Sequence, residues 1–413
     1  MSASMYDEAV HTLRTNDQGG YTVPTAGLYP YQWNWDSAFA ALGFARFDKD
    51  RAWREVETLF EAQWPDGMVP HIVFRVDEPT YFPGPTVWQA NLGPLPSSGI
   101  TQPPVAGSIV RHLAPTSEDR AQALLPHIDA WHRWFHAARD PEGFGVIAIT
   151  HPWESGRDNL PNWDRPGDAI DTSGVGEYQR RDTAMVDPDQ RPKKADYDRY
   201  LALIQVGVER NWDRDAVAAE TPFFVADVGT TAILLRAERD LLAMAEEFGG
   251  IDPQPIRERI ARMEVGFERL WNPDIRAYCS LDLRTGELAE TASSASFLAW
   301  YAGIDAHHEE LLGELKRYTD ATNFAVPSFD PHHTLFNSVR YWRGPVWAMM
   351  NWMIAQGLAD VGQHDWYERI RSDTLALIEK SGFAEYFDPG DGGACGGDTF
   401  TWTAAIWLAW SET

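Results

Sequence analysis

The stretch from Tyr29 to Arg46 reads YPYQWNWDSAFAALGFAR and changes character halfway along its length. Its first half is an aromatic segment without helical periodicity, whereas its second half is rich in the small and apolar residues of a buried helix. Asp36 or Ser37 is expected to cap that helix, which we predict over 38–46. The stretch therefore predicts a unit in which a helix begins directly after an aromatic loop.

The rest of the chain extends this arrangement into paired helices. A short helix is expected over 4–14, before the stretch. From the stretch onward, apolar periodicity, caps and breakers predict twelve helices: 38–46, 50–63, 102–113, 117–138, 195–212, 228–248, 253–271, 293–302, 305–318, 345–358, 364–381 and 400–410. Their spacing is too irregular for a solenoid repeat. Six consecutive pairs, joined alternately by short turns and long loops, favour an all-α fold: one (α/α)6 barrel over residues 1–413, with its long loops at one end.

Composition and charge limit the classes of function. The chain has 413 residues, 44% of them apolar, and a net charge of −26, which argues against nucleic-acid binding because phosphates require clustered Lys and Arg. Cys279 and Cys395 lie far apart and outside any metal-binding spacing, so neither a disulfide framework nor a zinc site is expected. Without a signal peptide or a long apolar run, we expect a cytoplasmic protein that needs no membrane. The sequence does not decide whether the chain forms a homo-oligomer.

Tryptophan content points to a sugar ligand. The chain contains 19 Trp, and 13% of its residues are aromatic. Amphipathic rings serve as platforms for ligands that combine an apolar face with a polar rim, as sugars do. The alternative is that the indoles fill wedges in the core of a large helical barrel.

A second stretch, His151 to Asn159, reads HPWESGRDN and concentrates groups that do chemistry. Pro152 and Gly156 break helical periodicity, so the segment is predicted to be a loop, where catalytic residues concentrate. The alternative is a surface loop in which Arg157 pairs with Glu154 or Asp158.

A third stretch supplies a second carboxylate. Glu385 lies within the aromatic segment 383–387 and is followed by a glycine-rich turn that ends near Gly397. Hydrolysis of a glycosidic bond needs one acid to protonate the leaving oxygen and one base to activate water, roles that Asp158 and Glu385 can divide. An aromatic neighbour such as Trp153 would raise the pKa of the acid by desolvation. The alternatives are a solvated glutamate and a plain turn; a calcium loop through Asp388, Asp391 and Asp398 is disfavoured because its spacing is not that of an EF-hand.

Together with two further segments, these stretches resemble glycoside hydrolase family 63, and more narrowly its short bacterial mannosylglycerate and glucosylglycerate hydrolases. The matching segments occur in the same order along essentially the whole chain: WNWDS at 33–37, GITQPP at 99–104, WESGRDN at 153–159, RGPVW at 343–347 and EYF at 385–387.

The resemblance implies an inverting, exo-acting α-glycosidase without a cofactor or a metal, with Asp158 as general acid and Glu385 as general base. Their carboxyl groups would then be separated by about 6.5–9.5 Å, leaving room for a water molecule. It also implies that Arg181 or Arg191 binds a glycerate carboxylate. The implied sugar contacts are Tyr29, Trp33, Trp35, Asp36, Tyr81, Gln102, Trp153, Tyr341, Trp342 and Trp347.

Several alternatives accompany this reading. Within the enzymes, an α-glucosidase or α-mannosidase could act on neutral short oligosaccharides or on glucosylglycerol. Outside that class stand a non-catalytic sugar-binding barrel and an isomerase of the epimerase type. Because a small ligand must enter and leave, we also predict that 68–101 and 162–191 include lids that order on binding.

Overall fold

A closed ring of six helices forms the centre of the molecule. The computed structural model describes residues 4–411, and within them the inner helices pack side by side in the order α2, α5, α11, α13, α15, α17 and back to α2. Most of their residues are buried, as expected of helices with neighbours on several sides. Their bounds are Asn34–Phe44, Val105–Leu113, Val228–Phe248, Leu298–Tyr301, Ala348–Asp360 and Thr401–Trp410.

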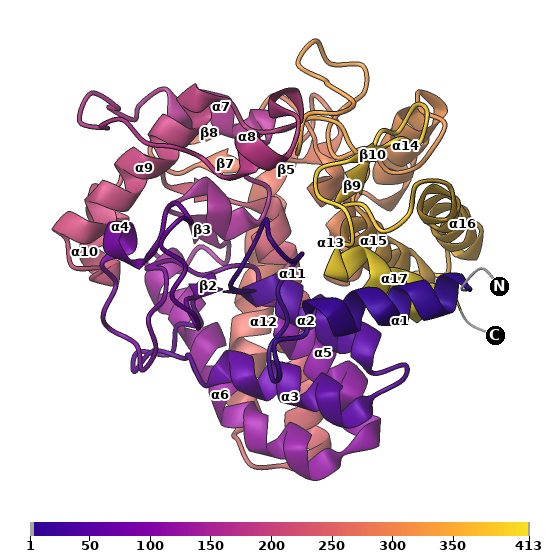
Figure 1. Ribbon diagram of the computed structural model, residues 1–413, viewed down its shortest axis with the longest axis horizontal. Helices are drawn as coiled ribbons and strands as arrows, with labels where there is room; N and C mark the ends of the chain where they lie inside the picture. Colours follow the sequence, from indigo (N-terminus) through magenta and orange to yellow (C-terminus); the bar gives the residue numbers. More distant parts are fainter. Residues whose placement is uncertain (1–3, 412–413) are drawn as a thin grey trace.

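A second layer of helices covers the ring. Five of the outer helices pack against inner helices, α14 packs against the turn Ser294–Phe297 that leads into α13, and one face of each outer helix is exposed. Together the two layers form the predicted (α/α)6 barrel (Figure 1). The outer helices are α1 (Met5–Asn16), α3 (Lys49–Phe60), α6 (Glu118–Arg139), α12 (Pro253–Phe267), α14 (His308–Asp320) and α16 (His364–Ser381).

The structure corrects which twelve helices build the barrel. The predicted helix 195–212 exists as α9 (Lys194–Glu209), but it packs against α4 and α10, outside the ring. The short N-terminal helix, which the count of twelve left out, is α1 and packs against α17 and α2. In Figure 1, α9 and α1 lie on opposite sides of the molecule. An amphipathic helix specifies that one face is covered, and not which element covers it.

The inner helices all begin at the same end of the barrel. Short connections such as 45–48, 249–252 and 361–363 join inner to outer helices at the far end, so the long loops return to the near end. The remaining helices lie in these loops: α4 (Pro85–Trp88), α7 (Asp164–Gly167), α8 (Asp182–Met185), α9 and α10 (Arg214–Glu220).

Short antiparallel strands stiffen the loop end. Four of them form one sheet in the order β3, β4, β7, β8, and the others pair as β1 with β2, β5 with β6 and β9 with β10. Each strand has two residues: Gln32–Trp33, Ile72–Val73, Ala148–Ile149, Val225–Ala226, Trp271–Asn272, Ala277–Tyr278, Leu281–Asp282, Glu287–Leu288, Tyr386–Phe387 and Ala394–Cys395.

Helix α2 begins earlier than its sequence predicts. Its cap residue is Trp33, which provides no side-chain cap, and Asp36 already lies in the first turn. The predicted capping role of Asp36 or Ser37 is therefore wrong. Since Asp36 does not cap the helix, its carboxyl group is available to the space at the end of the barrel.

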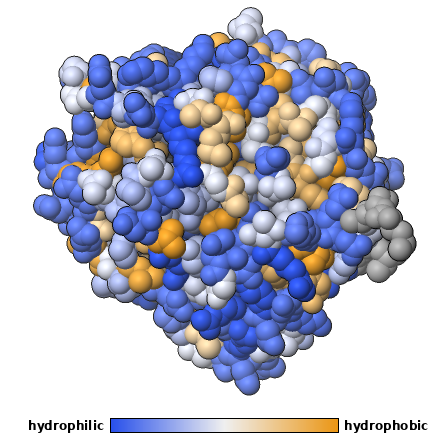
Figure 2. Space-filling view, viewed as in Figure 1, coloured by the Kyte–Doolittle hydropathy of each residue, from blue (hydrophilic) through white to orange (hydrophobic). Residues whose placement is uncertain are grey.

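The face of the molecule that Figure 2 shows is largely polar. In the view of Figure 2, hydrophobic residues form scattered small groups on a mostly hydrophilic face. Among the helices of residues 4–411, none combines the length and the apolar character needed to cross a membrane.

Candidate active site

A cavity lies at the loop end of the barrel, and the cavity together with its open mouth encloses about 810 Å³. The starts of α2 and α17 and the loops before α5 and α15 contribute to its wall, together with the segments 71–83 and 181–197. Aromatic rings make up much of that wall, and Asp36, Asp158, Asp182 and Glu385 are its carboxylate residues. A site of this kind can hold a small ligand between rings while acidic groups reach it.

Buried ion pairs fix the loop that carries Asp158. Arg157 pairs with Asp227, the cap residue of α11, with Nη2 2.6 Å from Oδ2, and Glu154 pairs with Arg139 at 2.6 Å. The alternative in which Arg157 pairs with Glu154 or Asp158 is therefore wrong. Gly156 has φ +68°, and a Cβ there would lie 2.4 Å from the ring of Trp35. Only glycine fits a positive φ at so close an approach.

The Asp158 carboxyl group has the electrostatics of an acid. Burial is the main effect that raises the pKa of Asp158 to about 7; the Arg191 guanidinium opposes this rise, and the Glu385 carboxylate adds to it. Asp36, also in the cavity wall, has its pKa raised well above the usual range, first by burial and then by Glu385. Near neutral pH the cavity can therefore contain a protonated carboxyl group able to donate a proton.

The Glu385 side chain is completely buried and accepts hydrogen bonds at both oxygens. Oε1 accepts from the Tyr29 hydroxyl at 3.1 Å, and Oε2 accepts from the Gly397 backbone N–H at 2.9 Å. Arg191 Nη1 lies 3.2 Å from Oε1 and 3.1 Å from Oε2. At Gly396, with φ +74°, a Cβ would lie 2.4 Å from Oε2, so glycine is required beside this carboxylate.

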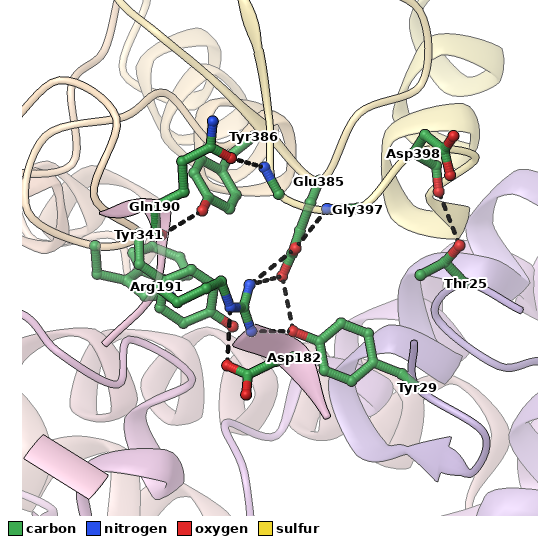
Figure 3. A network of polar contacts seen from close by, with 12 residues as sticks. Thr25, Tyr29, Asp182, Gln190, Arg191, Tyr341, Glu385, Tyr386, Gly397 and Asp398 are labelled. Atoms are coloured by element: carbon green, nitrogen blue, oxygen red, sulfur yellow. Dashed lines mark hydrogen bonds and ion pairs between the residues drawn. The ribbon is translucent and has the colours of Figure 1, made fainter. Parts of the chain in front are cut away.

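Arg191 links the loop above the barrel to the barrel itself. Its Nε lies 3.1 Å from Asp182 Oδ2, its Nη2 donates to the Tyr29 hydroxyl, and its guanidinium stacks on the Tyr341 ring at 4.2 Å (Figure 3). Burial of Tyr29 raises the pKa of its hydroxyl well above the usual range, so that hydroxyl stays protonated. Arg181 also lines the cavity, and its Nη1 is buried without a hydrogen-bond partner.

The structure brings most of the predicted site residues together. Eight of the ten predicted sugar contacts line the cavity with Asp158 and Glu385: Tyr29, Trp33, Trp35, Asp36, Tyr81, Gln102, Trp153 and Tyr341. Trp342 and Trp347 do not line it. They stack face to face at 3.9 Å, and Trp347 stacks on Tyr386 at 4.5 Å, so these indoles pack behind the wall.

Other cavity residues were missed by the sequence reasoning. His71 is buried, its Nδ1 has no hydrogen-bond partner, and burial lowers its pKa well below the usual range. Its ring stacks on Trp153 at 5.9 Å, which makes it a neutral polar group at the cavity wall. Trp402, which lies in the predicted helix 400–410 and is not among the predicted sugar contacts, lines the cavity from the first turn of α17. No local pattern distinguishes either residue from a core residue.

Over residues 4–411, no group of three or more His, Cys, Asp and Glu side chains is placed to hold a metal ion.

An aromatic cavity that holds Asp158, with its raised pKa, and a second carboxyl group, Glu385, has the pair of groups that hydrolysis of a glycosidic bond needs. The comparison with protein families agrees: residues 29–403 match the mannosylglycerate hydrolase MGH1-like glycoside hydrolase domain. The chain therefore belongs to that family, within glycoside hydrolase family 63.

Relatives and solved structures match along the entire chain. A mannosylglycerate hydrolase of Thermus thermophilus is 45% identical, with 98% of this chain and 100% of the relative covered. A glucosylglycerate hydrolase of Mycolicibacterium hassiacum is 33% identical, with 97% and 96% covered. The crystal structure of a family 63 mannosylglycerate hydrolase from Thermus thermophilus in complex with Tris and D-glycerate has a TM-score of 0.95 at 44% identity and covers 99% of this chain and 100% of that one.

Proposed function

We propose that this enzyme hydrolyses the α-glycosidic bond of a glycosylglycerate, with inversion at the anomeric carbon. The proposal rests on one observation: a pair of carboxyl groups and a pair of arginines line the same cavity. Asp158 and Glu385 provide an acid and a base, while Arg181 and Arg191 provide cationic partners for a carboxylate. Two relatives that differ in their sugar, named for mannosylglycerate and for glucosylglycerate, support the glycerate half of the substrate.

The reaction divides between the two carboxyl groups. Asp158, whose pKa burial raises to about 7, gives its proton to the glycosidic oxygen as the bond to the anomeric carbon breaks. A water molecule attacks that carbon from the opposite face and releases its proton to Glu385. The products are the free sugar as its β anomer and glycerate, and the two carboxyl groups return to their starting states through exchange with solvent.

The cavity offers different surroundings to the two halves of the substrate. Trp33, Trp35 and Trp153 provide ring faces for the sugar, and the Asp36 Oδ1, a buried oxygen without a partner, can accept from a sugar hydroxyl. The glycerate carboxylate meets Arg181 or Arg191. Arg181 Nη1 makes no hydrogen bond and lies 3.6 Å from Glu78 Oε1, whereas Arg191 already contacts Glu385 and Asp182.

Sugar release tests the proposal. Mannosylglycerate, glucosylglycerate, glucosylglycerol and short α-linked disaccharides are each incubated with the enzyme, and proton NMR identifies the first anomer formed. We expect the β anomer from one or both glycerate conjugates and no release by the Asp158→Asn variant. Release of sugar from neutral substrates alone would confirm a glycoside hydrolase but exclude a glycosylglycerate as its substrate. Release of the α anomer would exclude an inverting mechanism.

We also propose that residues 1–413 act as one catalytic domain in the cytoplasm and that the small sugar conjugate is the only partner that catalysis requires. The ring closes where α17 packs against α2, and α1 covers α17 from outside, so helices from both ends of the chain complete the barrel. A truncated variant that ends before α17 would lose one wall of the cavity, including Trp402.

A further inference from the structure

The base Glu385 has no free acceptor site in this structure. An ionised carboxylate has about four lone-pair positions on its two oxygens. Four contacts of 3.2 Å or less use them: one from Tyr29, one from Gly397 and two from Arg191 Nη1, which sits between the two oxygens. A general base must accept a proton from water, so one of these contacts has to be lost before Glu385 can act.

Arg191 is the contact that can leave. Gly397 belongs to the same segment as Glu385, and Tyr29 precedes the inner helix α2, so both are parts of the barrel wall. Arg191 comes from the loop between α8 and α9, above the barrel, and its Nε is held by Asp182 of the same loop (Figure 3). Neither Arg191 nor Asp182 belongs to the inner ring, so the two can move together once the hydrogen bonds of the adjacent Gln190 to Tyr386 and Gly396 break.

A buried guanidinium does not leave its partner without a replacement. Arg191 is 3% exposed, and removing one partner from a buried pair leaves an uncompensated charge. With Asp36 and Asp158 protonated, the ion-paired groups next to Glu385 carry no net charge: Arg180 and Arg191 pair with Asp182, and Arg191 also pairs with Glu385. Freeing Glu385 for catalysis therefore requires one additional anion at Arg191.

We infer that the carboxylate of the aglycone supplies this anion: it draws Arg191 away from Glu385 and so frees the base to accept a proton from water. This inference rests on the proposed function. It makes Arg191 a specificity-determining residue that acts on kcat, because a neutral aglycone leaves the Arg191–Glu385 pair intact even when the sugar is bound. The charge of the aglycone then switches on the reaction in addition to contributing affinity.

Separating the sugar from the carboxylate tests the inference. The substrate is the α-glycosyl fluoride of the sugar found in the release assay, which fills the sugar site and leaves the aglycone site empty. In its hydrolysis water attacks the anomeric carbon, the C–F bond breaks with fluoride as the leaving group, and Glu385 accepts the water proton. Protonation by Asp158 is not required, so the rate reports on the base.

Free D-glycerate is then added at saturating fluoride substrate, with glycerol at the same concentration as the neutral control. We expect glycerate to raise kcat at least tenfold and glycerol to leave it unchanged. If glycerate leaves kcat unchanged or lowers it, or if glycerol activates equally, the inference is overturned.

Variants distinguish this role from a structural one. Arg191→Gln is expected to hydrolyse the fluoride without glycerate at a rate near that of the glycerate-activated wild type, to lose the response to glycerate, and to show a raised KM for the glycosylglycerate. A merely structural Arg191 would instead give a variant that is slower with both substrates. Arg191→Lys keeps the charge and is expected to retain the response at a higher glycerate concentration.

Arg180→Gln is the matched control. Arg180 contacts the same Asp182, with Nε 3.0 Å from Oδ1, and has no contact with Glu385 among the described residues. It is expected to keep the response to glycerate, and loss of the response there as in Arg191→Gln would contradict the inference. Failure of the proposed function looks different, because the glycosylglycerates themselves would then not be hydrolysed by the wild-type enzyme.

Discussion

Arg157 and Asp227 form an ion pair closed to solvent, and the pair joins the loop of Asp158, the proposed general acid, to the inner helix α11. Each residue is 2% exposed or less, and the Arg157 Nη2 to Asp227 Oδ2 distance is 2.6 Å. Asp227 also caps α11 by accepting from the backbone N–H of Thr230 at 2.9 Å. Because Asp158 directly follows Arg157, the position of the acid depends on the start of α11.

We therefore predict that Asp227→Asn affects both stability and catalysis. The variant leaves Arg157 buried without its counter-charge, which costs about 3–5 kcal/mol. Urea denaturation should show this loss, and kcat should fall more than KM rises because the acid is displaced. Asp252→Asn is the control: Asp252 caps α12 on the surface, and asparagine caps as well as aspartate. Equally small losses of stability and of kcat in the two variants would contradict the positioning role of Asp227.

The pKa of Asp158 predicts the alkaline limb of the pH profile. A general acid must be protonated in the free enzyme, and burial raises the pKa of Asp158 to about 7. We expect kcat/KM for a glycosylglycerate to fall about tenfold per pH unit above pH 7. The α-glycosyl fluoride, whose leaving group needs no proton, should lack this limb. If both substrates share the limb, it belongs to another group.

The same pKa predicts that Asp158→Asn stabilises the protein while abolishing activity on glycosylglycerates. The folded-state pKa is raised from its ordinary value of 3.8 to about 7, so between these values the folded state binds more protons than the unfolded state. Stability therefore falls as pH rises through this window, by up to about 4 kcal/mol at 1.4 kcal/mol per pKa unit. Thermal unfolding should show the variant gaining more at pH 8 than at pH 5. If the variant gained as much stability at pH 5 as at pH 8, or more, the result would argue against a buried, protonated Asp158.

Two tryptophans test the division between the cavity wall and the layer behind it. Trp33 lines the cavity, whereas Trp347 is 1% exposed and stacks on Trp342. We expect Trp33→Ala to raise KM tenfold or more with a smaller loss of stability, because it removes a sugar platform. Trp347→Ala should cost about 3–5 kcal/mol in urea denaturation. If Trp347→Ala raised KM as much as Trp33→Ala at permissive temperature, Trp347 would belong to the binding surface.

The helices of the barrel could be predicted because their signals are local. The periodicity of 228–248 and the Asp252–Pro253 cap and first turn each describe one helix, and the structure places α11 and α12 there. The choice of α9 over α1 was wrong because ring membership depends on contacts with α2 and α17, distant in sequence from each other. Periodicity reports that a face is covered, and the covering element is a tertiary property.

In the site, as in the barrel, local motifs could be predicted and tertiary contacts could not. Aromatic and carboxylate motifs marked the residues that line the cavity, but the partners that tune them come from elsewhere in the chain. Arg157 and Asp227 are 70 residues apart, and Arg191 and Glu385 are 194 apart. Trp33 and Trp347 both lie in aromatic motifs of the sequence. Only the tertiary packing shows that Trp33 is in the cavity wall and that Trp347 lies behind it.

The 162–191 loop above the cavity is hydrogen-bonded to the segment that follows Glu385, and these hydrogen bonds lead to the last prediction. The Gln190 carbonyl accepts from the Tyr386 hydroxyl at 2.6 Å, and Gln190 Oε1 accepts from the Gly396 backbone N–H at 2.8 Å (Figure 3). The two predicted lids also touch each other, since Phe82 stacks on Tyr178 at 5.3 Å. Gln190 is thus a latch between the 162–191 loop and the Glu385 segment.

We predict that D-glycerate slows backbone hydrogen exchange in 68–101 and 162–191, and that Gln190→Ala reduces this protection. Loss of the side-chain hydrogen bond to Gly396 loosens the loop, and a net hydrogen bond contributes about 1 kcal/mol, so exchange near residues 182–191 should accelerate about fivefold. Gln205→Ala is the control, because Gln205 reaches the same loop only through a 3.5 Å contact with the Gly174 carbonyl. Equal protection with and without D-glycerate would show that these segments are not lids. Equal acceleration in both variants would show that Gln190 is not a latch.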